Sequence, residues 1–222
     1  DLFFPAFLVM IGFGLILLQP DFGSGLVMVC SIVIMVLAAD SPLSYFVRVG
    51  ILGAGGLGGL ILSAPYRLAR ITSFIDPWKD PLGAGFQIIQ SLFAIAPGGI
   101  LGVGFDNSMQ KHFYLPEPQT DFIFAIYAEE FGFIGSVLLI GLFIAVIYQG
   151  VKIAKNCTDP YLCYIAIGLT SLFAIQVMIN LGVVVGLFPV TGITLPFISY
   201  GGSSLMVMMG SMGLLMSIAK ES

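Results

Sequence analysis

Asp121 stands where a polar, proline-spaced run becomes an apolar helix, in the stretch YLPEPQTDFIFAIYAEE, residues 114–130. Ionisable side chains in or beside a bilayer are costly, so each one is a candidate functional group. A carboxylate at the start of a membrane helix therefore suggests a functional role for Asp121. The alternative is that Thr120 or Asp121 caps the helix, where the helix dipole favours an acid.

Polar side chains crowd the approach to Asp121. They are Lys111, His112, Glu117 and Gln119. A helix cap explains why an acid occupies position 121, but it does not explain this crowding. One histidine is weak evidence for a metal ligand. The spacing alone therefore leaves the cap and the functional interpretation evenly balanced.

Arg67 and Arg70 are three residues apart near the outer end of a predicted span, so they can point the same way. Paired guanidinium groups suit a phosphate or pyrophosphate, because each planar fork binds two oxygens at once. Ordinary snorkelling to the interface is the alternative, and the residues alone favour it. Asp21, in QPDFGSG, could support the same outer site, but a cap for the next span is the favoured interpretation.

Two further acids, Glu129 and Glu130, lie about 12 Å along the helix from Asp121, at 1.5 Å per residue. On a helical wheel Asp121 shares its face with small residues, which should pack against another helix. Those small residues are Ala125, Ala128, Gly132 and Gly135. Glu129 lies about 80° away and Glu130 nearly opposite, so the three acids cannot all face one cavity. We expect at least one glutamate to bond a polar group on a neighbouring helix, where Gln176 and Asn180 are available.

The composition is that of an integral membrane protein. Of 222 residues, 58% are apolar and only 9% are charged, and the mean hydropathy is +1.06. Soluble domains are about 45–50% apolar and about 25% charged. The net charge of −4 is small and no basic tract is present, which argues against nucleic acid as a partner. Cys30, Cys157 and Cys163 show neither metal-ligand spacing nor a disulfide framework.

The hydropathy pattern predicts an all-α fold, a polytopic bundle of about six transmembrane helices in a single domain, 1–222. The predicted spans are 2–18, 24–38, 45–63, 121–150, 161–186 and 201–218. The long extracellular loop, 64–120, holds most of the charge. Within this loop the apolar run 85–105 is split at Pro97, and its first arm, 86–96, is too short to span. This arm predicts an amphipathic interfacial or re-entrant element.

The charges at the helix ends predict the orientation. Arg48, Lys152, Lys155 and Lys220 lie at one set of ends, which the positive-inside rule makes cytoplasmic. Three irregular segments, around 19–25, 64–120 and 186–202, then lie outside together and form the predicted working surface. Because the chain begins with Asp1 inside an apparent helix, we expect that an N-terminal part precedes it.

Four stretches resemble the SEDS family, which includes FtsW, RodA and SpoVE proteins, in the family's order and over nearly the whole chain. They are LQPDFGSGL (18–26), RLARITSFIDPWKDPLGAGFQIIQSL (67–92), GVGFDNSMQKHFYLPEPQTDFIFAIYAEEFGFIG (102–135) and FPVTGITLPFISYGGSS (188–204). The stretch FYLPEPQTDFIFA resembles FtsW and SpoVE more than RodA.

The resemblance implies a ten-helix protein of the bacterial cytoplasmic membrane, of which this chain carries the last six helices. It implies a peptidoglycan glycosyltransferase that polymerises lipid II in division or cell-shape maintenance, with a class B penicillin-binding protein as partner. Asp121 matches the family's essential acid. The implied substrate-binding residues are Arg67, Arg70, Lys111, His112, Glu117, Gln119 and Thr120. The supporting residues are Asp21, Glu129, Glu130, Asn180, Ser199 and Gly201.

The implied reaction is attack of a sugar 4-hydroxyl on the anomeric carbon of a second lipid II. The leaving pyrophosphate needs positive charge from Arg, Lys or a divalent cation such as Mg²⁺ or Mn²⁺, for which Asp121 is a candidate ligand. A lipid II flippase would instead need a polar path, which Glu129, Glu130, Gln176 and Asn180 could line. A scaffold without chemistry is the third interpretation. The apolar cytoplasmic halves, such as 138–148, favour the enzyme.

Overall fold

The computed structural model describes residues 3–19, 21–39, 55–56, 59, 70, 72–83, 85–109 and 119–221, and within these ranges it contains helices and no strand. The helices are α1 (Phe3–Leu18), α2 (Phe22–Ala38), the 3₁₀ helix η1 (Pro77–Lys79), α5 (Phe86–Gly98), α7 (Ile123–Asn156), α8 (Pro160–Val184) and α9 (Gly202–Glu221). The all-α prediction is confirmed. The predicted span 45–63 lies outside the described residues, apart from positions 55, 56 and 59.

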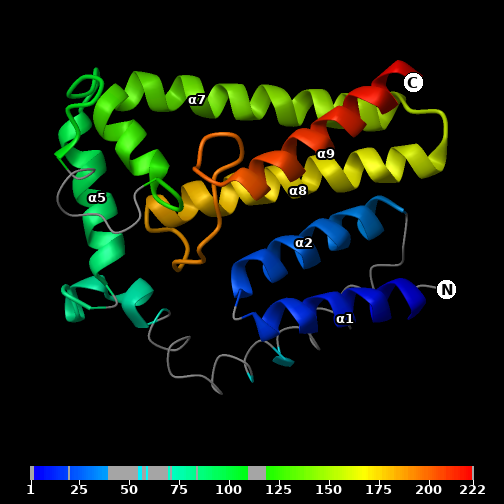
Figure 1. Ribbon diagram of the computed structural model, residues 1–222, viewed down its shortest axis with the longest axis horizontal. Coiled ribbons are helices and arrows are strands. Elements are labelled where there is room, and N and C mark those ends of the chain that lie inside the picture. Colours follow the sequence, from blue (N-terminus) through cyan, green and yellow to red (C-terminus); the bar gives the residue numbers. More distant parts are fainter. Residues whose placement is uncertain are drawn as a thin grey trace.

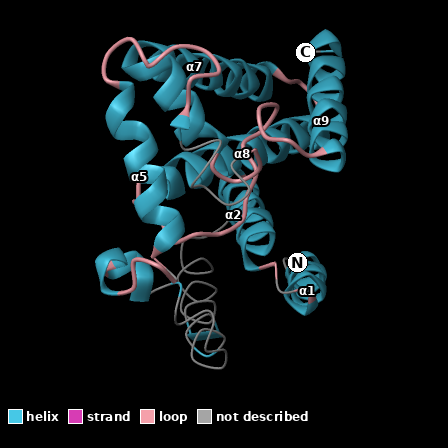
Figure 2. Ribbon diagram, turned by 60° about the vertical axis from the view of Figure 1, so that its left-hand side comes forward, coloured by secondary structure: helices cyan, strands magenta, loops and turns pink. Residues whose placement is uncertain are grey.

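The long helices run side by side, and α5 lies across one end of them (Figure 1). α8 is central, because α2 and α7 both pack along it. Phe122, Phe173 and Val184 are almost fully buried in the core between them. Figure 2 shows the loop after α5 arching over α5 and α7, while another loop lies between α8 and α9. The helices thus form a bundle, and the loop after α5 lies at the end that α5 covers.

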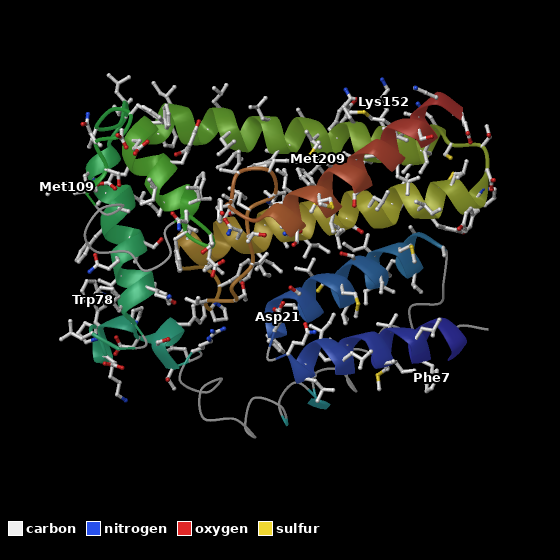
Figure 3. All side chains as sticks on the ribbon, in the orientation of Figure 1. Phe7, Asp21, Trp78, Met109, Lys152 and Met209 are labelled. Carbon is white, nitrogen blue, oxygen red and sulfur yellow. The ribbon has the colours of Figure 1, made fainter. Side chains whose placement is uncertain are left out.

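Three of the described helices, α7, α8 and α9, are long and apolar enough to cross a membrane. α1 and α2 are apolar but shorter, at 16 and 17 residues. These helices support a multi-pass membrane protein, while the count of six spans stays a prediction. Figure 3 places Lys152 at the end of the bundle opposite Trp78 and Met109. The predicted cytoplasmic lysine and the predicted outer loop therefore lie at opposite ends.

The short apolar arm of the long loop is a helix, as predicted. α5 has 13 residues, too few to span a bilayer, and it ends at Gly99, which has φ 50°. Its Ile88 and Ile89 are buried, whereas Leu92 and Phe93, one turn further along the helix, are exposed. Ser91 Oγ donates to Val184 O at 2.7 Å, which ties α5 to the end of α8.

α7 is broken into two helical segments, 123–131 and 133–156, at Gly132. Gly132 has φ 67° and ψ −162°, a conformation that is essentially reserved for glycine. The first segment runs from the loop before α9 toward α5, and the second runs back along α8 (Figure 1). The prediction of one continuous helix over 121–150, with one shared face from Asp121 to Gly135, is therefore wrong.

The loop after α5 fills the break in α7 with backbone hydrogen bonds. A continuous helix would pair the amide of Phe133 with Glu129 O, and the amide of Ile134 with Glu130 O. Instead these four groups bond the loop 99–104. The bonds are Val103 N to Glu129 O at 3.0 Å, Gly104 N to Glu130 O at 3.1 Å, Phe133 N to Gly99 O at 2.9 Å and Ile134 N to Ile100 O at 3.2 Å. The break thus leaves none of these four backbone groups unpaired, which a membrane protein requires.

Candidate functional site

The loop 186–201, between α8 and α9, touches each of the other segments singled out in the sequence. Near the start of α2, a Cβ added to Gly23 would lie only 2.5 Å from Thr191 O, so only glycine fits there. Arg70 is exposed and donates from Nη1 to Val190 O at 3.2 Å. The loop therefore joins the QPDFGSG motif, one of the paired arginines and the segment that carries Asp121.

Three consecutive backbone carbonyls before α7 are held by this loop and by α8. Tyr200 N donates to Gln119 O at 2.8 Å. Ser199 Oγ donates to Thr120 O, and Asn180 Nδ2 donates to Asp121 O at 2.8 Å. The path of the chain into Asp121 is therefore fixed by hydrogen bonds from outside its own helix.

The Asp121 carboxylate lies beside the backbone of Gly192, because a Cβ added to Gly192 would be 3.7 Å from Oδ2. Asp121 is half-buried, and Phe122, which follows it, is only 1% exposed. Phe122 occupies the N-cap position of α7, and no side-chain hydrogen bond caps the helix there. The N-cap position is therefore Phe122, one residue after the two that the sequence suggested. The arrangement presents a fixed, partly accessible carboxylate that could accept a proton.

Glu129 and Glu130 are both buried, 2% and 6% exposed. Glu129 accepts hydrogen bonds from Ser108 Oγ and, at 3.1 Å, from Met109 N. A structural role for one glutamate was predicted, and these bonds support it. The expected partners were wrong, however, because Ser108 and Met109, which follow the loop after α5, take the place expected for Gln176 and Asn180. The break at Gly132 admits that loop beside Glu129.

The amides expected to meet the glutamates bind the loop 186–201 instead. Gln176 Nε2 donates to Thr194 O at 3.1 Å. Asn180 Nδ2 donates to Ile193 O at 2.7 Å as well as to Asp121 O. These two residues, one helical turn apart on α8, therefore anchor the loop that surrounds Asp121.

The remaining predicted site residues are placed as follows. Asp21 caps α2 as favoured, since its Oδ1 accepts from Ser24 N at 3.0 Å. Gly201 O accepts from Leu205 N at 2.9 Å in the first turn of α9. Arg67, Lys111, His112 and Glu117 lie outside the described residues. Within the described ranges, no group of three or more His, Cys, Asp or Glu side chains could hold a metal ion.

Sequence reasoning missed two contributors to this region. Ser108 carried no signal, because a single serine in DNSMQ looks like any loop residue. Thr194 sits in a stretch rich in Pro and Gly, and its hydroxyl lies 3.1 Å from Ser204 Oγ. The sequence feature that could have indicated Thr194 is a polar residue between two apolar ones in that loop.

Comparison with known proteins identifies the family. A family model for FtsW, RodA and SpoVE, described as cell cycle proteins, matches residues 1–222. Stage V sporulation protein E of Bacillus subtilis is 54% identical over 99% of this chain and 60% of its own length. A probable peptidoglycan glycosyltransferase FtsW of Coxiella burnetii is 46% identical over 98% of this chain and 59% of its own length. The chain thus spans about three fifths of these relatives.

Solved structures agree with the sequence comparison. A chain from a study of structural coordination of polymerization and crosslinking by a peptidoglycan synthase complex has TM-score 0.78 and 35% identity, covering 100% of this chain and 62% of its own length. The rod shape determining protein RodA of Thermus thermophilus has TM-score 0.65 and 29% identity, covering 98% of this chain and 56% of its own. Sequence and fold agree, and the chain belongs to the FtsW/RodA/SpoVE family of cell cycle proteins.

Proposed function

We propose that the protein carrying this chain is a peptidoglycan glycosyltransferase that polymerises lipid II, with Asp121 as the general base. The observation that carries the proposal is the set of three hydrogen bonds that fix residues 119–121 and hold Asp121 half-buried beside the loop 186–201. The names of the relatives support the same activity, since the FtsW protein of Coxiella burnetii is called a probable peptidoglycan glycosyltransferase.

In the proposed step, the 4-hydroxyl oxygen of the acceptor sugar attacks the anomeric carbon of the donor lipid II. The hydroxyl proton passes to the Asp121 carboxylate, and the new glycosidic bond forms. The bond between the anomeric carbon and the pyrophosphate oxygen breaks, and the electron pair leaves with undecaprenyl pyrophosphate. Arg70, which already reaches the loop 186–201, would stabilise that charge together with Arg67. Lys111, His112, Glu117, Gln119 and Thr120 would hold the sugars.

The contacts of the buried polar side chains argue against a transporter. A flippase needs polar groups free to line a path, but Gln176 donates to Thr194 O, and Asn180 donates to Ile193 O and to Asp121 O. Glu129 is bonded to Ser108 and Met109. The segment 133–156 that leads to the cytoplasmic end is almost purely apolar until Lys152. These groups hold the fold around Asp121 and do not form a continuous track.

The partner and the location follow from the same family. One structural relative comes from a complex described as coordinating polymerization and crosslinking. We infer that this protein works beside a crosslinking transpeptidase, a class B penicillin-binding protein, at the outer face of the bacterial cytoplasmic membrane. Membrane lipid would then surround the apolar surfaces of α7, α8 and α9, and lipid II would enter from that lipid.

The test replaces Asp121 with Asn in the full-length protein bound to its partner. Asn keeps the shape and loses the base, so polymerisation of labelled lipid II should fall by about 10²–10⁴-fold, while membrane expression and thermal stability remain. The matched control is Asp21→Asn, because Asn is as good a helix cap as Asp, and this variant should keep most of its activity. A series of divalent cations separates a base from a metal ligand, since loss of a base is not relieved by more cation. Near wild-type polymerisation by Asp121→Asn would remove Asp121 from the mechanism.

A further inference from the structure

The side chain of Asn180 hydrogen-bonds both the backbone of Asp121 and the loop 186–201. Its Nδ2 group donates one hydrogen to Asp121 O at 2.8 Å and the other to Ile193 O at 2.7 Å. Both partners are carbonyl oxygens, which can only accept, so the orientation of the amide is determined by its surroundings. Asn180 is 1% exposed and lies on the central helix α8.

The side-chain oxygen of Asn180 indicates that packing alone does not explain an asparagine at this position. Asn180 Oδ1 is buried and has no hydrogen-bond partner among the described residues. A buried polar atom without a partner lowers the stability of a fold, and a leucine, which has the same branching, would have no such atom. The benefit of asparagine at this position therefore comes from its two donated bonds.

We infer that Asn180 is a positioning residue for the reaction, an inference that rests on the proposed role of Asp121. It sets the distance between the carboxylate and the loop 186–201, because one rigid amide fixes both backbones. Ile193 O is next to Gly192, whose backbone lies beside Asp121 Oδ2. The two bonds thus hold Asp121 and the loop 186–201, and the acceptor hydroxyl must be placed between them. Small errors in such a distance slow the chemical step by up to about 100-fold.

Gln176 provides a matched control on the same helix. It is one turn before Asn180, carries the same functional group, and donates to Thr194 O in the same loop. Within the described residues it makes no hydrogen bond to the segment 119–121. Replacing either residue by leucine removes an amide that anchors the loop, but only Asn180→Leu also releases Asp121.

The experiment measures initial rates of polymerisation against lipid II concentration for the full-length protein with its partner. We expect Asn180→Leu to lower kcat by about 10–100-fold with KM within twofold, and Gln176→Leu to change kcat by less than threefold. The solvent deuterium isotope effect on kcat should rise in Asn180→Leu only, because transfer of the proton to a misplaced base becomes slower. A general loss of loop structure would instead change KM in both variants.

A second variant keeps the inference testable if Asn180→Leu fails to fold. Asn180→Ser is small and well tolerated between membrane helices, but one hydroxyl cannot reach both carbonyls, so the same loss in kcat is expected. The inference is overturned if either Asn180 variant keeps kcat within twofold, or if Gln176→Leu matches it in kcat, KM and isotope effect. Active Asp121→Asn would instead refute the proposed function, so the two failures are distinguishable.

Discussion

Gly132→Ala should disrupt the junction between the loop 99–104 and α7. The added Cβ would lie 2.7 Å from Ile100 O and even closer to Gly102 N, and backbone atoms cannot rotate away from it. The conformation itself, φ 67° and ψ −162°, costs about 1–3 kcal/mol for a residue with a side chain. The variant therefore has two routes: it keeps the break and expels the loop, or it straightens α7.

The hydrogen bonds decide between these routes. Keeping the break while expelling the loop loses four bonds, or about 2–6 kcal/mol at 0.5–1.5 kcal/mol each, with the strain added. Straightening the helix restores two bonds, from Phe133 N to Glu129 O and from Ile134 N to Glu130 O, so the net loss is two bonds, or about 1–3 kcal/mol. We expect the straight helix. A straight α7 cannot form without moving the segment 123–131. Asp121, just before that segment, would then move away from the loop 186–201.

The assay combines polymerisation with hydrogen exchange in the full-length protein. Gly132→Ala should abolish most activity, and the amides of Val103 and Gly104, which lose Glu129 O and Glu130 O as partners, should exchange rapidly. The control is Gly141→Ala on the same helix, where an added Cβ meets nothing within 4 Å. That change should stabilise the helix by up to about 1 kcal/mol and leave activity intact. Slow exchange at Val103 and Gly104, with activity within twofold of the wild type, would refute the reasoning.

Two further predictions concern the segments on either side of the site. Glu129→Gln should lower the free energy of unfolding by about 1–3 kcal/mol, because one of the two accepting oxygens becomes an NH₂ group that cannot accept. A double-mutant cycle with Ser108→Ala should show coupling of about 1–2 kcal/mol, and additive effects would contradict the hydrogen bond between them. Arg70→Lys can still donate to Val190 O but loses the planar fork, so kcat for polymerisation should fall several-fold, because the charge on the leaving pyrophosphate is less well stabilised; an unaltered kcat would instead favour interfacial snorkelling.

The sequence alone predicted the helices and the helix cap that depend only on residues close together in the chain. Apolar length predicted α1, α2, α8 and α9 within a few residues, because a membrane helix needs only a run of about 20 apolar residues. The cap by Asp21 followed from QPDFGSG, since an acid after proline and before glycines suits an N-cap. The type and position of Asp121 predicted a functional acid through the cost of charge in a bilayer.

What could not be predicted depends on contacts between distant segments. Nothing near Gly132 marks a break, because EEFGFIG continues the apolar pattern on both sides and an isolated glycine is common in a membrane helix. The loop 99–104 lies about 30 residues earlier, and only the fold brings its carbonyls to Phe133 and Ile134. The helical wheel therefore suggested Gln176 or Asn180 as the partner of one glutamate, whereas Glu129 bonds Ser108 and Met109.

The break at Gly132 also gives a different explanation for the acids at the two ends of the segment 123–131. Nine residues make a helix of roughly 13 Å, which is too short to be stable alone. Both of its ends are therefore held from outside: Asn180 holds the carbonyl of Asp121, and the loop 99–104 holds the carbonyls of Glu129 and Glu130. The Glu129 side chain adds the bonds to Ser108 and Met109 at the second end. Because the segment is rigid once both ends are fixed, a loss at the Glu129 end should displace Asp121 as surely as a loss at Asn180, and the two acids act on the same geometry from opposite ends.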